Sequence, residues 1–586
     1  MENKKELLNV RWDLSDLGKE ETLEEDLEKI KKLALGIESQ KKGYIPEISI
    51  EKFKDIFKHY EDLLVALSQY TTYAYLKFYK NTADAKAQAL TAKADQIEAE
   101  IKNKVLFVEL SFKEFDDKNA QRLIVASPLY QHYLERLREL KPFTLKEDVE
   151  RVINIKDTTG ISALISLYEV FTSDFMFDFE GKKITKEELV KFVRDPLPEI
   201  RERAYQTLIG RYQQNKNTLS LMYQTVVNNW KNEAEMRKYP SPMSIRNKRN
   251  DLDDQDVESL LKVFKKHIPF FQDYFKEKAR LLGMNKLRRF DLYAPFRKTI
   301  KHYTFPQAKE MVLASFQPFP EFVQYASAII ENHLDSEPNP GKRGGAFCHY
   351  PNHRTKPYVM MNFVGDVNSA RTLAHELGHG IHATLSSQKN NYFHYDPVLP
   401  MAETASTFGE MLLLDFMKKQ SPELIQELNL GQLDDAYATI ARQFHFVLFE
   451  KEAHELVKKG GSREDLEQIY LKMLREHFGD AVDVDDIFKY EYLYIPHIYH
   501  TPFYCYAYGF GLLLSLGLYS RYLKDPSFKK HIIQIFSAGG NDTPRNILKK
   551  AGIEMNEEFW QSGFDYLQEL LNEVKNDRFD AVGSSP

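Results

Sequence analysis

The helical periodicity of the first 140 residues is the feature that most limits what this chain can fold into. From Thr22 to about Leu140, apolar residues recur at spacings of three and four, and proline and glycine are sparse. One such apolar stripe consists of Phe53, Ile56, Tyr60, Leu63, Leu64 and Leu67. The pattern predicts a helical lobe, with most of its charged residues on solvated helix faces.

Helical patterns continue along most of the chain, with two interruptions. Residues 174–185 (DFMFDFEGKKIT) alternate between apolar and polar side chains on either side of Glu180 and Gly181, which predicts a short hairpin before a helix that begins at Thr185. Residues 336–369 are rich in glycine, proline and asparagine, and they contain the apolar run Tyr358 to Phe363 (YVMMNF), which predicts a strand. We therefore expect a mainly α-helical protein with small β elements.

Composition excludes several classes of function. Of the 586 residues, 43% are hydrophobic, so disorder does not describe the whole chain. The 80 basic and 86 acidic residues give a net charge of −6, which does not favour a nucleic-acid partner. Two cysteines, Cys348 and Cys505, are too few for a disulfide framework, and residues 1–9 lack the apolar run of a signal peptide. These features predict a cytoplasmic location.

The longest uncharged stretch, Thr501 to Ser520, raises the question of a membrane span. It contains Pro502 and several tyrosines, glycines and serines, which a bilayer-spanning helix seldom combines. We interpret it as buried structure and expect no membrane partner.

The motif that indicates chemistry is AHELGHG, from Ala374 to Gly380. In a helix, His375 and His379 lie one turn apart, about 6 Å along the axis, and their ring nitrogens can converge on one Zn²⁺ at about 2.1 Å each. Glu376 is rotated by roughly 100° from His375, so it is poorly placed as a third ligand but well placed to act as general base on a water at the metal. The motif predicts a zinc site.

The third protein ligand is not a histidine in the metzincin arrangement. That arrangement needs glycine at position 382 and histidine at position 385, whereas this chain has His382 and Leu385. His382 shares a face with His375, but seven residues correspond to about 10 Å of helix, too far for the same zinc ion. We expect His382 to be structural or to orient a ligand.

A carboxylate from a later helix is the alternative, and a helix is predicted from about Pro400 to Met417 (PMAETASTFGEMLLLDFM). Glu403 in its first turn is the preferred ligand. Glu410, two turns further on, is either the ligand instead or a group that orients one of the histidines. His394 and Asp396, in the preceding loop, are lesser candidates. Three protein ligands leave a fourth position open for water, which is typical of a catalytic site.

Such a site suits peptide-bond hydrolysis, in which Glu376 passes the proton of the attacking water to the leaving amine. The developing oxyanion needs hydrogen-bond donors, and the segment Pro496 to Gly509 supplies a pool of them: His497, His500, Tyr504, Tyr506 and Tyr508. An extended peptide can also pair with a sheet edge near the predicted strand and so pass the metal.

Seven segments together resemble one family. They are WDLSDL at Trp12, GAFC at Gly345, YVMMNF at Tyr358, HELGHG at His375, ETASTFGE at Glu403, IPHIYHTPFYCYAYG at Ile495 and GGNDTP at Gly539. With these segments the chain resembles the oligoendopeptidase F group of the M3 metallopeptidases over nearly its full length. The likeness is most specific at the segments around the predicted zinc site.

The resemblance implies a large helical clamshell of two lobes with a deep channel and a small sheet beside the zinc-binding helix. It implies one zinc ion held by His375, His379 and Glu403, with Glu376 as base. It also implies that His497, together with Tyr504 or Tyr508, assists the oxyanion. In domain terms we expect an N-terminal helical lobe over residues 1–195 and the catalytic region over residues 196–586.

The implied substrates are short, unstructured peptides, which are cleaved at internal bonds, because a folded protein does not thread into a channel. A zinc carboxypeptidase of related clamshell type is the alternative within enzymes. A peptide-binding protein with an inactive site is the alternative outside them, although the presence of Glu376 argues against a purely structural zinc site.

Overall fold

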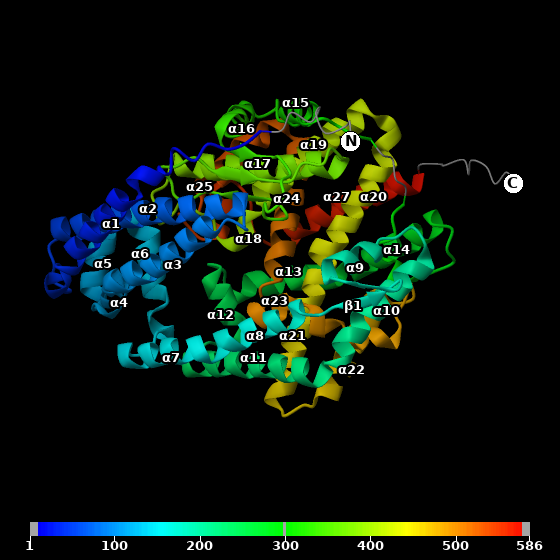
Figure 1. Ribbon diagram of the computed structural model, residues 1–586, viewed down its shortest axis with the longest axis horizontal. Helices are drawn as coiled ribbons and strands as arrows, with labels where there is room; N and C mark the ends of the chain where they lie inside the picture. The colour runs from blue at the N-terminus through cyan, green and yellow to red at the C-terminus, as the bar shows by residue number, and fades with distance from the viewer. Residues whose placement is uncertain (1–9, 297–300, 577–586) are drawn as a thin grey trace. The chain divides into compact units, whose positions relative to one another are not determined.

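The computed structural model describes residues 10–296 and 301–576 (Figure 1). The N-terminal stretch 1–9, used above to argue against a signal peptide, lies outside the described residues. The chain forms two compact units, each built from three separate segments. Unit 1 consists of Met1–Pro142, Ile300–Gln420 and Arg521–Glu554, and unit 2 of Phe143–Thr299, Ser421–Ser520 and Met555–Pro586. These units do not follow the expected boundary at residue 195, which stays a prediction about sequence regions.

Unit 1 is mainly helical. Its helices are α1 (Leu23–Glu38), α2 (Ile50–Lys80), α3 (Ala85–Val105), α4 (Phe107–Glu114), α5 (Asp117–Ala126), α6 (Gln131–Glu139), α15 (Phe305–Ser315), α16 (Pro320–Asn332), α17 (Val367–Ser387), α18 (Leu399–Ala402), α19 (Thr404–Gln420), α25 (Lys529–Ala538) and α26 (Pro544–Lys550). Its strands are β4 (Leu334–Asp335), β5 (Phe347–His349) and β6 (Tyr358–Met360).

Unit 2 is helical as well. Its helices are α7 (Glu147–Thr159), α8 (Ile161–Ser173), α9 (Lys186–Phe192), α10 (Pro198–Gln214), α11 (Lys216–Met236), α12 (Pro242–Arg249), α13 (Asp254–Lys266), α14 (Ile268–Leu281), α20 (Ile425–Ala436), α21 (Arg442–Lys458), α22 (Arg463–Phe478), α23 (Pro496–His500), α24 (Tyr506–Lys524, its last turn in unit 1) and α27 (Glu557–Asn576). Its strands are β1 (Phe177–Phe179), β2 (Lys182–Ile184), β3 (Leu287–Arg288) and β7 (Val482–Asp483).

The predicted helical character of the N-terminal region is confirmed. The apolar stripe that includes Phe53 and Leu63 is buried in the core formed by α1 to α6. Ser49 caps α2, because its hydroxyl accepts a hydrogen bond from the backbone N–H of Lys52 at 3.2 Å. The apolar spacing was thus sufficient to predict that this region is helical.

The predicted hairpin is confirmed too. Strands β1 and β2 pair antiparallel, with Phe179 opposite Lys182. Glu180 and Gly181 form the turn with φ values of 51° and 74°, a left-handed pair that suits the twist of a two-residue hairpin. Thr185 and Glu188 then form a capping box that starts α9.

The predicted strand at Tyr358 lies inside a sheet rather than at its edge. It is limited to Tyr358–Met360, all three residues are buried, and the strand order is β4-β6-β5. β6 pairs parallel with β4 and antiparallel with β5. Any peptide that adds a strand to this sheet therefore pairs with β4 or β5, not with β6.

The uncharged segment 501–520 provides most of α24, and its apolar residues are largely buried, as expected. Within residues 10–296 and 301–576, no helix combines the length and the apolar character that a bilayer crossing requires.

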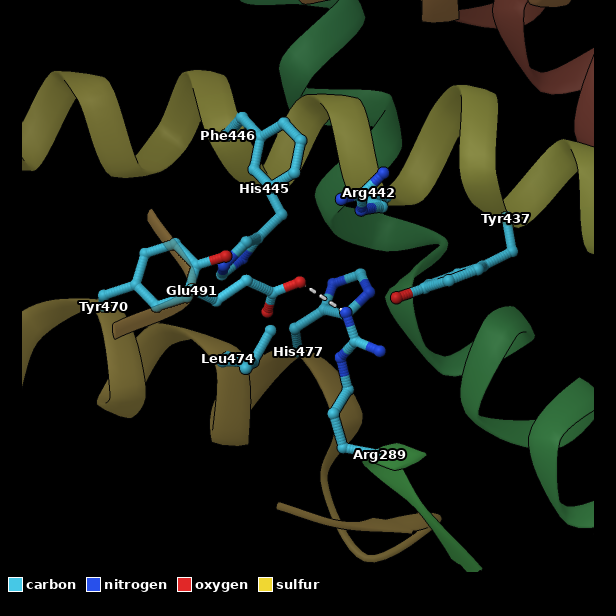
Figure 2. Close-up of a pocket in the computed structure, with 9 residues that line it drawn as sticks. All are labelled: Arg289, Tyr437, Arg442, His445, Phe446, Tyr470, Leu474, His477 and Glu491. Atoms are coloured by element: carbon cyan, nitrogen blue, oxygen red, sulfur yellow. Dashed lines mark hydrogen bonds and ion pairs between the residues drawn. The ribbon is translucent and has the colours of Figure 1, made fainter. Parts of the chain in front are cut away.

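The core of unit 2 contains buried charges (Figure 2). Arg289 and Glu491, each 1% exposed, form an ion pair at 2.5 Å. The hydroxyl of Tyr494 donates a hydrogen bond to the same carboxylate oxygen at 3.1 Å. Burial lowers the pKa of the neighbouring His445 to about 3 and that of His477 as well, so both imidazoles are neutral. Arg289, Glu491 and the two histidines line a cavity of about 10 Å³, a volume that suits one water molecule.

Candidate metal centre

Helix α17 presents the two histidines of the motif on one face, as the spacing predicts. The helix is capped by Asp366, whose carboxylate accepts a hydrogen bond from the backbone N–H of Ser369 at 2.7 Å. The ring centroids of His375 and His379 are 4.9 Å apart. In Figure 1, α17 lies beside α16 and α25, both of which pack against it.

Glu403 completes the group from a break between two helices. It follows α18, has φ −80° and ψ −5°, and precedes α19. Its Oε2 lies 3.4 Å from Nε2 of His375 and 3.4 Å from Nε2 of His379. All three candidate ligand atoms lie within 4.8 Å of one another, and no other such group occurs in the part of the chain that the structure describes.

These distances fit a zinc ion. Ligands at about 2.1 Å on a tetrahedral zinc lie about 3.4 Å from one another, the separation that Glu403 has from both histidines. The electrostatic field fits as well. Although burial opposes a positive charge here, Glu403 and Glu410 raise the pKa of His375 to about 10. Carboxylates that stabilise an imidazolium at this place also favour a divalent cation there.

Glu410 bonds the opposite nitrogen of the first histidine. Its Oε1 lies 2.7 Å from Nδ1 of His375, and its Oε2 accepts a hydrogen bond from the guanidinium of Arg371 at 3.0 Å. Of the two roles considered for Glu410, this geometry suits the orienting one, because a hydrogen bond at Nδ1 leaves Nε2 free to face the metal.

Glu376 is buried beside the group without contributing a ligand atom to it. Burial raises its pKa, and the two histidines oppose this effect. The thiol of Cys348 in β5 lies within electrostatic reach, because its pKa is raised first by burial and then by the charge of Glu376. Glu376 therefore lies near β5, an edge strand of the small sheet.

Two glycines allow α17 and α19, which flank the candidate ligand group, to approach each other closely. A Cβ atom on Gly378 of α17 would lie 2.5 Å from the Cα of Ser406, and one on Gly409 of α19 would lie 2.9 Å from the carbonyl oxygen of Ala374. Each helix thus supplies a glycine where the other helix crosses. The sequence analysis missed both glycines, as it missed Arg371. Glycines within helical patterns, and an arginine one turn before a ligand histidine, were the available signals.

The remaining candidates of unit 1 lie outside the ligand group. His382 is buried against Phe536 and hydrogen-bonds to the backbone of Ala402, next to Glu403, which is the structural role expected for it. Nε2 of His394 accepts a hydrogen bond from the backbone N–H of Tyr133 at 3.1 Å. Asp396 lies in a separate cavity. The two loop candidates for the third ligand were therefore wrong.

The donor pool predicted at Pro496 to Gly509 belongs to unit 2, and the structure divides it. His497, Tyr504 and Tyr508 gather: the hydroxyl of Tyr508 lies 3.4 Å from Nε2 of His497, and the rings of the two tyrosines are 5.2 Å apart. Burial and the charge of Arg442 lower the pKa of His497, so its imidazole is neutral.

The other two members of the pool have structural partners. His500 lies 3.0 Å from Glu169, and the buried hydroxyl of Tyr506 accepts a hydrogen bond from Asn250 at 2.8 Å.

Known proteins are similar to this chain in sequence and in fold. Residues 192–565 match the profile of peptidase family M3. Oligopeptidase PepF of Bacillus subtilis is 26% identical over 593 residues, which cover 96% of this chain and 88% of the relative. Group B oligopeptidase PepB of Streptococcus agalactiae is 26% identical over 88% of both chains.

Solved structures agree in fold. A candidate peptidase from Chlamydophila abortus superposes with a TM-score of 0.86 at 22% identity, over 96% of this chain and 97% of the other. Oligoendopeptidase-F from Enterococcus faecium superposes with a TM-score of 0.70 at 22% identity, over 94% of this chain and 98% of the other. The mainly helical fold class predicted from the sequence is confirmed.

Fold, ligand group and sequence together define an enzyme of the metalloendopeptidase class. Because the matched profile spans more than half of the sequence, the chain belongs to peptidase family M3. The division of the chain at residue 195 stays a prediction.

Proposed function

We propose that this enzyme is a zinc-dependent oligoendopeptidase that hydrolyses internal bonds of short, unstructured peptides. The observation that carries the proposal is the convergence of His375, His379 and Glu403, with 3.4 Å between the carboxylate and each imidazole, beside the buried Glu376. The names of the relatives, oligopeptidase and oligoendopeptidase, support the substrate class.

In this proposal His375, His379 and Glu403 hold the metal, and Glu410 and Arg371 fix the ring of His375. When bound, zinc supplies Lewis acidity, which polarises the scissile carbonyl and makes water a better nucleophile. Glu376 accepts a proton from the attacking water and delivers it to the leaving amine.

His497 and one of the two clustered tyrosines, Tyr504 or Tyr508, are the proposed donors to the carbonyl oxygen. A neutral imidazole N–H and a phenol hydroxyl can both donate a hydrogen bond to a developing oxyanion. The contact between Tyr508 and His497 supports a joint role, because each group limits the orientation of the other.

The test is mass spectrometry of the products from one unstructured peptide of about nine residues, incubated with and without a chelator. Internal cuts that the chelator abolishes are expected. Stepwise loss of C-terminal residues would instead indicate a carboxypeptidase, and an intact peptide would favour a peptide-binding protein. An intact globular protein should be cleaved far more slowly than the peptide, and equal rates would contradict the substrate class.

The Glu376→Gln variant tests the base directly. It should retain the metal and lose about 10²–10⁴-fold in kcat, because an amide does not accept the proton. Glu331→Gln is the matched control, because Glu331 is an exposed residue of α16. A cytoplasmic location, supported by two free cysteines, belongs to the same proposal.

A further inference from the structure

A polar cavity of about 350 Å³ lies in unit 1 beside the edge strand β5. Three parts of the chain line it. Helix α2 contributes Ser68, Thr71 and Thr72, the segment from Cys348 to Pro351 forms a second wall, and the loop before α18 adds Tyr395 and Asp396. Its volume suits an amino-acid side chain rather than a single solvent molecule.

Asp396 provides the only full charge among the residues that line this cavity. Its carboxylate hydrogen-bonds to Tyr350 and has no ion-pair partner among the described residues. Burial lowers the pKa of His349 to about 4, so this imidazole is neutral at neutral pH. Burial raises the pKa of the Cys348 thiol, so that it stays protonated.

The tyrosines that face Asp396 are uncharged as well. Burial raises the pKa values of Tyr350 and Tyr395, and the charge of Asp396 adds to this effect. The pKa of Tyr392 is raised by burial, then by the charge of Glu98 and then by that of Asp396. Among the residues that the structure describes, no cationic group compensates the negative charge of this carboxylate.

The surroundings of Asp396 make its charge costly. Partial desolvation raises the pKa of Asp396 to about 6, although the hydrogen bond from Tyr350 opposes the change. Its side chain nevertheless remains accessible to solvent, so a ligand can reach it. A partly desolvated carboxylate is stabilised most by a cation that pairs with it.

The loop that carries Asp396 is held in place from several directions. Gly540 donates its backbone N–H to the carbonyl of His394 at 2.8 Å, and a Cβ atom on Gly540 would lie 2.7 Å from the carbonyl oxygen of Asp396. Ser386 donates to the carbonyl of Tyr395 at 2.6 Å. The carboxylate is thus presented by a rigid loop rather than by a mobile surface segment.

The position of the cavity links it to the catalytic group of the same unit. Strand β5 is an edge of the sheet and packs against α17. It contains Cys348, and the charge of Glu376 contributes to the raised pKa of this thiol. A peptide that adds a strand to β5 would point alternate side chains toward the walls beside that strand.

We propose that this cavity binds a cationic group of the peptide substrate, with Asp396 as the specificity-determining residue. The inference rests on the proposed peptidase function. The cation is either the side chain of a lysine or arginine or the N-terminal ammonium group, since both offer donors to a carboxylate.

The experiment compares two pairs of unstructured nonapeptides with the zinc-loaded enzyme. One pair differs by lysine against norleucine at successive positions before the cleaved bond, and the other by a free against an acetylated N-terminus. The cationic member of one pair should have a kcat/KM about tenfold higher, the size of one charge-assisted hydrogen bond. Whichever pair shows the preference identifies the source of the cation.

Asp396→Asn should reduce that preference to about one. Because each variant is compared on two peptides, a general loss of activity cancels from the ratio. Asp415→Asn is the matched control: Asp415 pairs with Lys419 on α19, and the preference should stay at its wild-type value in this variant. Equal cleavage of both members of both pairs by the wild type would overturn the inference, as would a preference that survives in Asp396→Asn.

A binding measurement separates this inference from the proposed function. Anisotropy of the labelled peptides with the Glu376→Gln variant reports affinity without turnover. Suppose that the wild-type enzyme cleaves no peptide, but that the cationic peptide binds more tightly than its neutral counterpart. If this difference in affinity disappears with Asp396→Asn, the peptidase proposal fails and the cavity assignment stands. If the wild-type enzyme cleaves the peptides but binds the cationic and neutral peptides equally well, only the cavity assignment fails.

Discussion

Oε1 of Glu410 lies 2.7 Å from Nδ1 of His375, on the side of the imidazole opposite to Glu403. The ring is therefore held between two carboxylates with different tasks. In the proposed site, one orients the ring and fixes its tautomer, and the other would share the metal ion with it.

The two carboxylates should differ in their effect on metal retention. Glu410→Gln is expected to weaken metal affinity by about 10–100-fold, the usual effect of losing a group that orients a ligand. Glu403→Ala should weaken it more, since a ligand is lost. Competition with a chelator, followed by metal analysis, measures both, with Glu331→Gln as control. The opposite order would exchange the roles of Glu403 and Glu410.

Gly378→Ala tests the crossing of α17 and α19. The added Cβ would lie 2.5 Å from the Cα of Ser406, so the backbones must separate, and we expect a loss of about 1–3 kcal/mol of stability. Metal affinity should fall as well, because Glu403 moves with α19.

Thermal unfolding and chelator competition provide the two readouts for Gly378→Ala. Gly210→Ala in α10 is the control: nothing lies within 4 Å of its Cβ, and alanine favours helix by about 0.5–1 kcal/mol. An unchanged melting temperature and metal affinity in Gly378→Ala would show that the crossing adjusts freely.

The sequence predicted those parts of the site that depend on local spacing. His375 and His379 share one helix, and a spacing of four residues fixes their relative geometry wherever that helix lies. Glu403 comes from another element, so its choice over Glu410 depended on a packing that no local pattern contains. The interruption of the helix at Glu403 could not be predicted either, because the residues around Glu403 continue a helical pattern.

Longer-range features were beyond the sequence for a similar reason. The central position of β6 depends on β4, which has only two residues and no recognisable strand pattern. The division into units depends on a chain that changes unit five times, at places without a shift in composition. Packing between distant segments determines both features, and the sequence of any one segment does not show which other segments it packs against.

Removing one partner of the buried ion pair in unit 2 should destabilise the protein strongly. Glu491→Gln leaves the guanidinium of Arg289 buried without a countercharge, so we expect a loss of about 3 kcal/mol. The control is Glu557→Gln, which removes an exposed carboxylate paired with Lys262 and Lys266 and should change little. Denaturant unfolding compares the two variants. Equal midpoints would mean that other groups around Arg289 stabilise its charge.

The preference for a cationic peptide should depend on pH in a way that identifies Asp396. Its pKa is raised to about 6 by burial, so the carboxyl is neutral below that pH and negative above it. Within the peptide pair that shows the preference, the ratio of kcat/KM for the cationic peptide to that for its neutral counterpart should therefore rise between about pH 5 and about pH 7 and then level off. Titration of the metal ligands and of Glu376 affects both peptides alike and cancels from this ratio.

In Asp396→Asn the ratio should stay near one throughout. A wild-type ratio that is high and constant across the range would mean that a group already charged below pH 5 recognises the cation.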